Sequence, residues 1–150
     1  MSGDLADTFH EVVPPRPFNE WEREAVALML DAGDAGDAAR AQLASARVIA
    51  QCTHCPTVTL RTDAGLPLMR RRPGTAAGGG FFALHGTDAD GMFVEMVLVA
   101  QGGRFTAIDV WRGDGAVLAP PALSTFTRAV GSSWDSPDVE VRHGKPGDTD

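Results

Sequence analysis

The chain has 150 residues, of which 43% are hydrophobic and 22% are charged, so it is long enough for one globular domain with its own core. Its formal net charge of −7 argues against general nucleic-acid binding, which needs cations to displace phosphate counterions, and it also disfavours an anionic membrane surface. No apolar run approaches the roughly 20 residues that span a bilayer, so we expect no membrane insertion.

Residue usage bears on origin and compartment. Lysine occurs only at Lys145, tyrosine is absent, and arginine, alanine and glycine are frequent, which indicates a GC-rich bacterial or phage genome. The first residues, MSGDLADTFHEV, are acidic and lack a charged-then-apolar leader. Because the chain also has only two cysteines, we predict a cytoplasmic location in which the thiols are reduced.

The ends of the chain are predicted to be flexible tails. Three prolines, Pro14, Pro15 and Pro17, break any helix in residues 1–17, and the polar stretch 143–150 lacks core-forming residues. Between them, residues 18–142 are expected to form a single α+β domain.

Two helices are predicted at the start of this domain. Asn19 is a good N-cap, and Glu22 three residues later completes a capping box. Apolar residues then recur at helical spacing until Gly33. After the DAGDAGD stretch, Asp37 is predicted to cap a shorter helix over roughly 38–46. We expect the two helices to cover one face of a sheet.

From residue 47 onwards the pattern is that of β-structure. Strands are predicted over residues 47–52, 57–61, 81–85, 92–100 and 104–112. The last two form the clearest element, a hairpin with a two-residue turn at Gly102-Gly103. Residues 120–130 fit either a short helix or an edge strand. The fold class we predict is α+β, with two N-terminal helices packed on a mostly antiparallel sheet of about five strands.

Pairing the hairpin symmetrically about its turn places Glu95 near Val110 and Met96 near Asp109. Under that register Met96, Asp109 and Trp111 share one face. The other face is then also apolar, through Phe93, Val97, Val99, Ile108 and Val110. A solvated antiparallel sheet should alternate apolar with polar residues, so we expect a cover for this second face. This cover could be a symmetric partner, the segment 113–142 or a target protein, and a homodimer is favoured narrowly over the segment 113–142.

The Cys52-Thr53-His54-Cys55 motif suggests redox chemistry or zinc. A thioredoxin-like motif needs a helix N-terminus after the first cysteine, whereas Pro56 and a β-branched run follow here. Structural zinc takes four ligands, and nothing in the spacing of the other histidines completes a site around Cys52, His54 and Cys55. We therefore expect packed, reduced and metal-free cysteines, and no cofactor.

The remaining candidates are charged. Arg70, Arg71 and Arg72 precede a glycine-rich run, but the GK[ST] ending and helix of a phosphate-binding loop are absent, so the interpretation is a solvated loop or an anion contact. Glu95 is expected to pair with Arg112 across the hairpin. Asp109 has no basic partner on its face. The candidate binding residues are Asp109, Trp111, Met96, His54, Arg70, Arg71 and Arg72.

Two stretches, CTHCPTVTL at residues 52–60 and GRFTAIDVW at residues 103–111, carry a resemblance. They resemble the C-x-C-P-[ST]-[IV]-x-L turn and the G-R-[LF]-x-x-[LI]-[DE]-V-[YW] hairpin of a family of small actinobacterial proteins with no established activity. The likeness spans roughly residues 18–118. His54 departs from the family, which has a small residue or a further cysteine there. The resemblance implies the fold and the origin, and it implies no function.

Two classes of function remain open. The first is a non-enzymatic binding or regulatory protein that acts through a protein partner, and the missing catalytic constellation favours it. The second is a small-molecule enzyme or binder with a pocket between helices and sheet, which would use Asp109 and the Cys52–Cys55 turn. A deep polar cavity would favour the second class, and a flat apolar patch the first.

Overall fold

The computed structural model describes residues 9–32, 36–69, 80–115 and 119–128. The described residues form two α-helices and one seven-stranded antiparallel sheet, so the predicted α+β class is confirmed, with more strands than the five expected. The predicted anion contact at Arg70, Arg71 and Arg72 and the predicted tail at 143–150 lie outside these residues.

The strands lie in the order β1-β2-β3-β6-β5-β4-β7. Their bounds are β1 Phe9–Arg16, β2 Arg47–Cys52, β3 Val58–Arg61, β4 Gly80–Thr87, β5 Phe93–Gln101, β6 Arg104–Arg112 and β7 Thr127–Arg128. The five predicted strands are all present, and the two further strands, β1 and β7, lie at the two edges of the sheet. β1 was not predicted, whereas an edge strand was one of the two alternatives for the region that contains β7.

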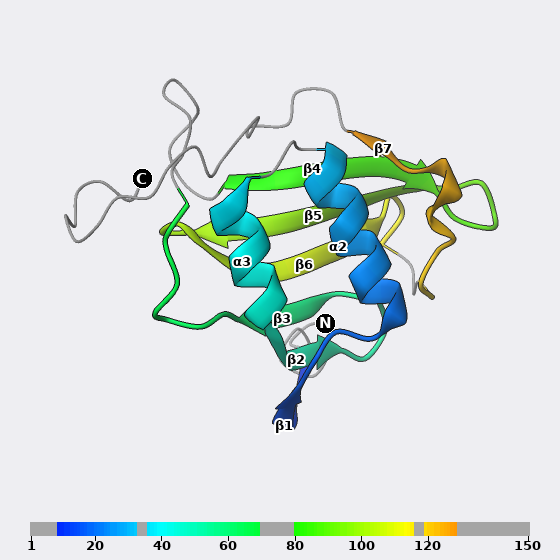
Figure 1. The fold of residues 1–150 in the computed structure, drawn as a ribbon. Helices are drawn as coiled ribbons and strands as arrows, with labels where there is room; N and C mark the ends of the chain where they lie inside the picture. The colour runs from blue at the N-terminus through cyan, green and yellow to red at the C-terminus, as the bar shows by residue number, and fades with distance from the viewer. Residues whose placement is uncertain (1–8, 33–35, 70–79, 116–118, 129–150) are drawn as a thin grey trace.

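Both helices, α2 (Glu20–Ala32) and α3 (Asp37–Ser45), lie side by side across the same face of the sheet (Figure 1). The predicted capping box at the start of α2 is confirmed. The Glu22 amide donates to Asn19 Oδ1 at 2.8 Å, and the Asn19 amide donates to Glu22 Oε1 at 2.9 Å. The predicted cap of α3 is wrong, because Gly36 is the N-cap and Asp37 is the first helical residue.

Residues 9–16 are a strand, whereas the sequence predicted that they belong to a flexible tail. β1 pairs with β2, with Phe9 opposite Cys52 and Arg16 opposite Val48. The two prolines of β1 are compatible with this position, because an edge strand need not donate every amide to a neighbour. Arg16 also donates two hydrogen bonds to the Glu22 carboxylate, at 2.9 and 3.0 Å, and so joins β1 to α2.

The other edge is formed by the segment that follows β6. Residues Leu123–Thr125 form one 3-10 turn, and Thr127–Arg128 then pair with β4. The sequence predicted either a short helix or an edge strand here, and the region contains a short form of each. The indole Nε1 of Trp21 donates to the carbonyl of Pro121 at 2.9 Å, which holds the segment against the start of α2.

The core lies between the helices and the sheet. Its fully buried large side chains include Met29 from α2 and Phe105, Met96, Leu98 and Ile108 from the central hairpin. One polar side chain, Gln42 of α3, is also fully buried there. Its amide donates to the carbonyls of Pro67 and Gly103, and its carbonyl accepts from the amide of Phe105.

The register predicted for the central hairpin is wrong by one residue. Gln101 pairs with Arg104 around the two-residue turn, as predicted, and both turn glycines have positive φ angles. The pairing then shifts between Val99 and Ala100, because Thr106 is an extra residue in β6. Every later residue of β6 therefore faces the opposite side from the predicted one, and Ile108 and Val110 are buried under the helices.

Candidate binding surface on the far face of the sheet

The face of the sheet opposite the helices is called the far face below. Three of its side chains form a row across the central strands, because His85 pairs with Glu95 and Glu95 pairs with Trp111. Phe93 lies two residues before Glu95 on β5 and therefore on the same face. The bulge at Thr106 creates this row, since without it Trp111 would face the core.

The four side chains are held against one another. His85 Nε2 lies 2.9 Å from Glu95 Oε2, and the indole Nε1 of Trp111 donates to Glu95 Oε1 at 2.8 Å. The Phe93 ring packs edge-on against His85 and against Trp111, with centroid distances of 4.9 and 6.1 Å. These four residues are called the aromatic cluster below.

Both aromatic rings of this cluster remain accessible to solvent. The exposed fraction is 42% for Phe93 and 42% for Trp111, whereas Val97 and Val99 beside them are half-buried. Rings whose orientation is fixed lose little side-chain entropy when a partner covers them, and Trp is among the residues enriched at the centres of protein interfaces. The aromatic cluster thus has the chemistry of a protein-binding surface.

The predicted site residues are only partly brought together. Asp109 is exposed on the far face, one row from Trp111, and it accepts a weak hydrogen bond from Thr57 Oγ1 at 3.3 Å. Met96 is fully buried under the helices, on the opposite face, because its predicted register was wrong. His54 is exposed in the loop between β2 and β3. His85, Glu95 and Phe93 were absent from the predicted binding residues.

The predicted ion pair between Glu95 and Arg112 is also absent from the described structure. Because of the bulge, Arg112 lies opposite Val94 and faces away from Glu95. Its guanidinium instead contacts carboxylates of two neighbouring loops, with Asp88 at 3.1 Å, Asp90 at 3.5 Å and Asp114 at 3.0 Å. Glu95 is left to orient the aromatic cluster.

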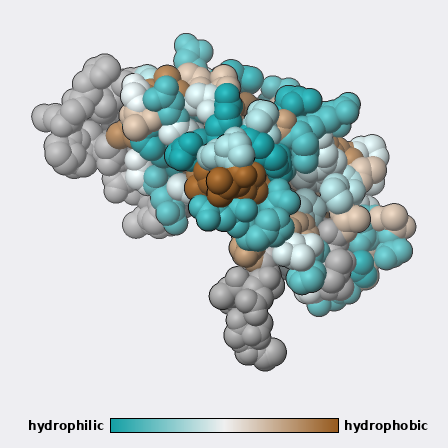
Figure 2. All heavy atoms as spheres, turned by 90° about the horizontal axis from the view of Figure 1, so that it is seen from below, coloured by the Kyte–Doolittle hydropathy of each residue, from teal (hydrophilic) through white to brown (hydrophobic). Residues whose placement is uncertain are grey.

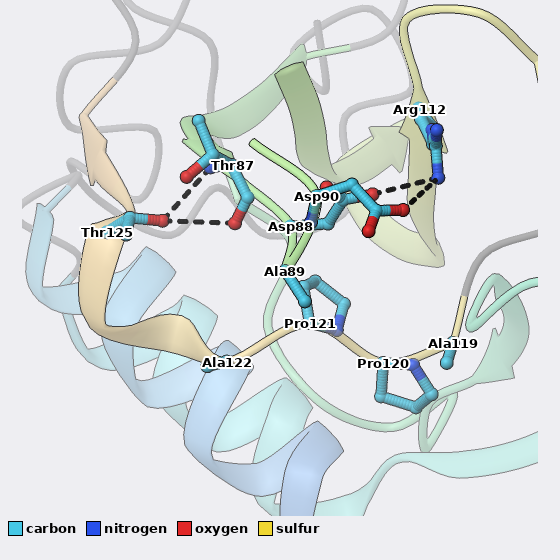
Figure 3. A pocket seen from close by; sticks show the side chains of 10 residues that line it. All are labelled: Thr87, Asp88, Ala89, Asp90, Arg112, Ala119, Pro120, Pro121, Ala122 and Thr125. Atoms are coloured by element: carbon cyan, nitrogen blue, oxygen red, sulfur yellow. Dashed lines mark hydrogen bonds and ion pairs between the residues drawn. The ribbon is translucent and has the colours of Figure 1, made fainter. Parts of the chain in front are cut away.

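Asp88, Asp90 and Arg112 line a cavity of about 350 Å³ between the β4–β5 loop and the segment 119–125 (Figure 3). Several of its polar groups bind one another. Asp88 and Asp90 face Arg112, and Thr125 Oγ1 accepts from the Thr87 amide at 3.0 Å and donates to the Thr87 carbonyl at 3.2 Å. The Asp90 carboxylate is nonetheless 73% exposed. Arg112 Nε is buried and makes an ion pair with Asp114 Oδ1 at 3.0 Å, but it has no hydrogen-bond partner among the described residues.

The Cys52–Cys55 turn is a pair of free thiols in a β-hairpin loop. The two Sγ atoms are 2.9 Å apart, and the Cys52 amide donates to the Thr57 carbonyl at 2.9 Å, which closes the loop. A cavity of about 150 Å³ adjoins it. Within the described ranges, no group of three or more metal-ligating side chains comes together.

Burial raises the pKa of the Cys52 thiol, and the hydrogen bond with Cys55 raises it further. A raised pKa means less thiolate at neutral pH, so we expect iodoacetamide to alkylate Cys52 more slowly in the native protein than in urea, and this can be followed by mass spectrometry of the Cys52 peptide. The Cys55→Ser variant should react faster than the wild type. Equal rates in the native and unfolded chains would contradict this assignment.

Among the described residues, no helix is long and apolar enough to cross a membrane. The comparisons found no match for this chain among protein-family models, curated proteins or solved structures, so the geometry described above is the basis on which its function is inferred.

Proposed function

We propose that this chain is a small non-enzymatic binding protein that docks a protein partner on the far face of its sheet. The observation that carries the proposal is the aromatic cluster, in which Phe93 and Trp111 are exposed yet held in fixed orientations by Glu95 and His85. The far-face surroundings support it, because half-buried valines and exposed Asp109 give an apolar centre with a polar margin.

A protein fits this surface better than a small molecule does. The cavities described above, beside Arg112 and beside Cys52, are not lined by residues of the aromatic cluster. Small ligands are usually held in concave sites that bury most of their surface, whereas the aromatic cluster stands on the face of a sheet. A broad partner surface can cover both exposed rings at once.

A second copy of the chain is the simplest partner to test. The register found in the structure reduces the apolar area that the far face offers to a homodimer, because Ile108 and Val110 are buried in the core instead of exposed on this face. Phe93 and Trp111 remain, so a symmetric interface would have to be centred on them. A different protein would use the same two rings.

The test combines self-association with selection of peptides. Sedimentation measured from low to high micromolar concentration detects a dimer, and a displayed random-peptide library selected on the wild-type protein supplies a defined ligand. Trp111→Ala should weaken either interaction roughly thirtyfold or more, because truncating a central aromatic residue of an interface costs about 2 kcal/mol or more.

Val13→Ala is the matched control, since Val13 is an apolar side chain that is 75% exposed on β1, away from the aromatic cluster. It should leave the dimer and the peptide affinity unchanged. Peptides that bind Trp111→Ala as tightly as the wild type, or a dimer lost only in Val13→Ala, would place the binding surface elsewhere.

A further inference from the structure

The helical layer contains a groove that the proposed function does not use. It lies between α2 and α3, on the side of the molecule that carries the helices, and encloses about 420 Å³. Its apolar lining comes from both helices, with Val26 and Leu30 of α2 facing Leu43 of α3. These three side chains are buried, and the exposed apolar residues that the two helices add to the lining are Ala27 of α2 and Ala44 of α3.

The rim of this groove is basic. Arg23 lies on the α2 side, Arg40 on the α3 side, and Arg47 just beyond the end of α3, while none of the residues lining the groove is an aspartate or glutamate. All three arginines are exposed. In a chain whose net charge is −7, an apolar groove bordered by three arginines is a local reversal of charge that the packing of the core does not require.

Two of the arginines are positioned at helical intervals from apolar residues of the groove. Arg23, Val26 and Leu30 follow the i, i+3, i+7 spacing of one stripe of α2, and Arg40 and Leu43 are three residues apart on α3. Arg47 lies beyond the end of α3, at the start of β2. Each wall therefore offers an apolar centre with a cation beside it. This is the pattern that an amphipathic helix meets when it lies in a groove between two others.

We propose that this groove docks an acidic amphipathic helix of a partner protein. The apolar side chains of that helix would pack into the groove against Ala27 and Ala44, and carboxylates on its flanks would contact Arg23, Arg40 and Arg47. A guanidinium can hold a carboxylate through two parallel hydrogen bonds, so each arginine adds direction as well as charge.

The arginines are partly oriented for this contact. Arg23 Nη1 donates to the carbonyl of Phe18 at 2.7 Å, and Arg47 Nη1 donates to the carbonyl of Ala46 at 2.9 Å, so each head group is tied to the groove wall. Arg40 contacts Asp31 at 3.4 Å, and both side chains are exposed, so this ion pair is weak.

The experiment uses the full chain and two synthetic helical peptides. The acidic peptide has leucines along one face and glutamates on both flanks, and the basic peptide differs only in having lysine at every glutamate position. Fluorescence anisotropy should show binding of the acidic peptide to the wild type. The doubly substituted Arg23→Glu, Arg40→Glu chain should bind it roughly tenfold or more weakly, because two ion pairs become repulsive.

Three control variants test whether charge, the groove and the far face each contribute to binding of the acidic peptide. Arg23→Lys with Arg40→Lys keeps the charge and should bind within a few-fold of the wild type. Ala27→Trp fills the groove at an exposed position and should remove binding, which separates docking in the groove from general attraction to arginines. Trp111→Ala should leave the peptide affinity unchanged, so this proposal can fail or hold independently of the far-face proposal.

Three outcomes would overturn the inference. The first is equal affinity of the acidic peptide for the wild type and for the charge-reversed chain. The second is equal affinity of the acidic and basic peptides for the wild type. The third is a dimer of this chain that the charge reversal abolishes, because the occupant of the groove would then be a second copy.

Discussion

Replacing Gln42 by leucine should lower the free energy of unfolding by about 2–4 kcal/mol, because the Pro67 carbonyl and the Phe105 amide lose their partner, whereas the Gly103 carbonyl keeps the hydrogen bond from the Met69 amide. The Gln42 side chain is fully buried and satisfies the carbonyls of Pro67 and Gly103 and the amide of Phe105. Leucine fills a similar volume but pairs with none of them, and each buried unpaired group costs about 1–3 kcal/mol. The expected loss of stability therefore comes from unpaired polar groups, and a cavity contributes little to it.

Urea denaturation followed by circular dichroism measures this loss. Gln101→Leu is the matched control, because Gln101 is exposed at the end of β5 and should change stability by less than about 0.5 kcal/mol. A Gln42→Leu variant as stable as the wild type would show that the hydrogen bonds of Gln42 do not stabilise the packing of α3 against the β5–β6 turn.

Replacing Glu22 by alanine is the second change for which we expect a large effect. The Glu22 side chain, only 4% exposed, closes the capping box of α2 and accepts both hydrogen bonds from Arg16 of β1. Removing one partner of a buried ion pair costs about 3–5 kcal/mol, but Arg16 is 30% exposed and can regain water, so we expect a loss of about 2–3 kcal/mol.

Two further variants separate the roles of this carboxylate. Glu22→Gln can still close the capping box but carries no charge for Arg16, so its loss should be smaller than that of Glu22→Ala. Glu24→Ala, at an exposed position of the same helix turn, should cost less than about 0.5 kcal/mol. Equal losses for Glu22→Ala and Glu24→Ala would show that β1 is not joined to α2 through this contact.

The elements set by local signals were predictable from the sequence. Asn19 and Glu22 are three residues apart, and their reciprocal hydrogen bonds depend only on the first turn of one helix. The Gly102-Gly103 turn likewise depends on two residues that tolerate positive φ angles. In both cases the residues that form the contact are neighbours in the chain, so a sequence pattern is enough.

The candidate site was not predictable, because it depends on register over a longer distance. Thr106 carries no mark that it is an extra residue in β6, yet it decides whether Trp111 or Val110 faces the helices. His85 lies ten residues before Glu95 on another strand, and only the paired sheet brings the two together. A half-buried carboxylate partner on a neighbouring strand leaves no local pattern around His85 that could have indicated it.

β1 was missed for a different reason. Its Pro14 and Pro15 argue against a regular element, and that inference holds for a helix or a central strand. It fails at the edge of a sheet, where one side of the strand faces solvent. Viewed from below, the molecule shows an apolar patch ringed by hydrophilic atoms (Figure 2). On β1 itself, Val13 is 75% exposed and Phe9 is 41% exposed.

The two edge strands together limit how copies of this chain can assemble. β7 has only two residues, and β1 has consecutive prolines that offer no amide hydrogen to an incoming strand. A ladder of main-chain hydrogen bonds from a second molecule would therefore be interrupted at Pro14 and Pro15 of β1. At the other edge, β7 pairs with only Leu84 and His85 of the eight-residue β4. At the β1 edge, contact through side chains projecting from a face is thus favoured over strand addition, and recognition then depends on the identity of those side chains rather than on backbone atoms common to all proteins.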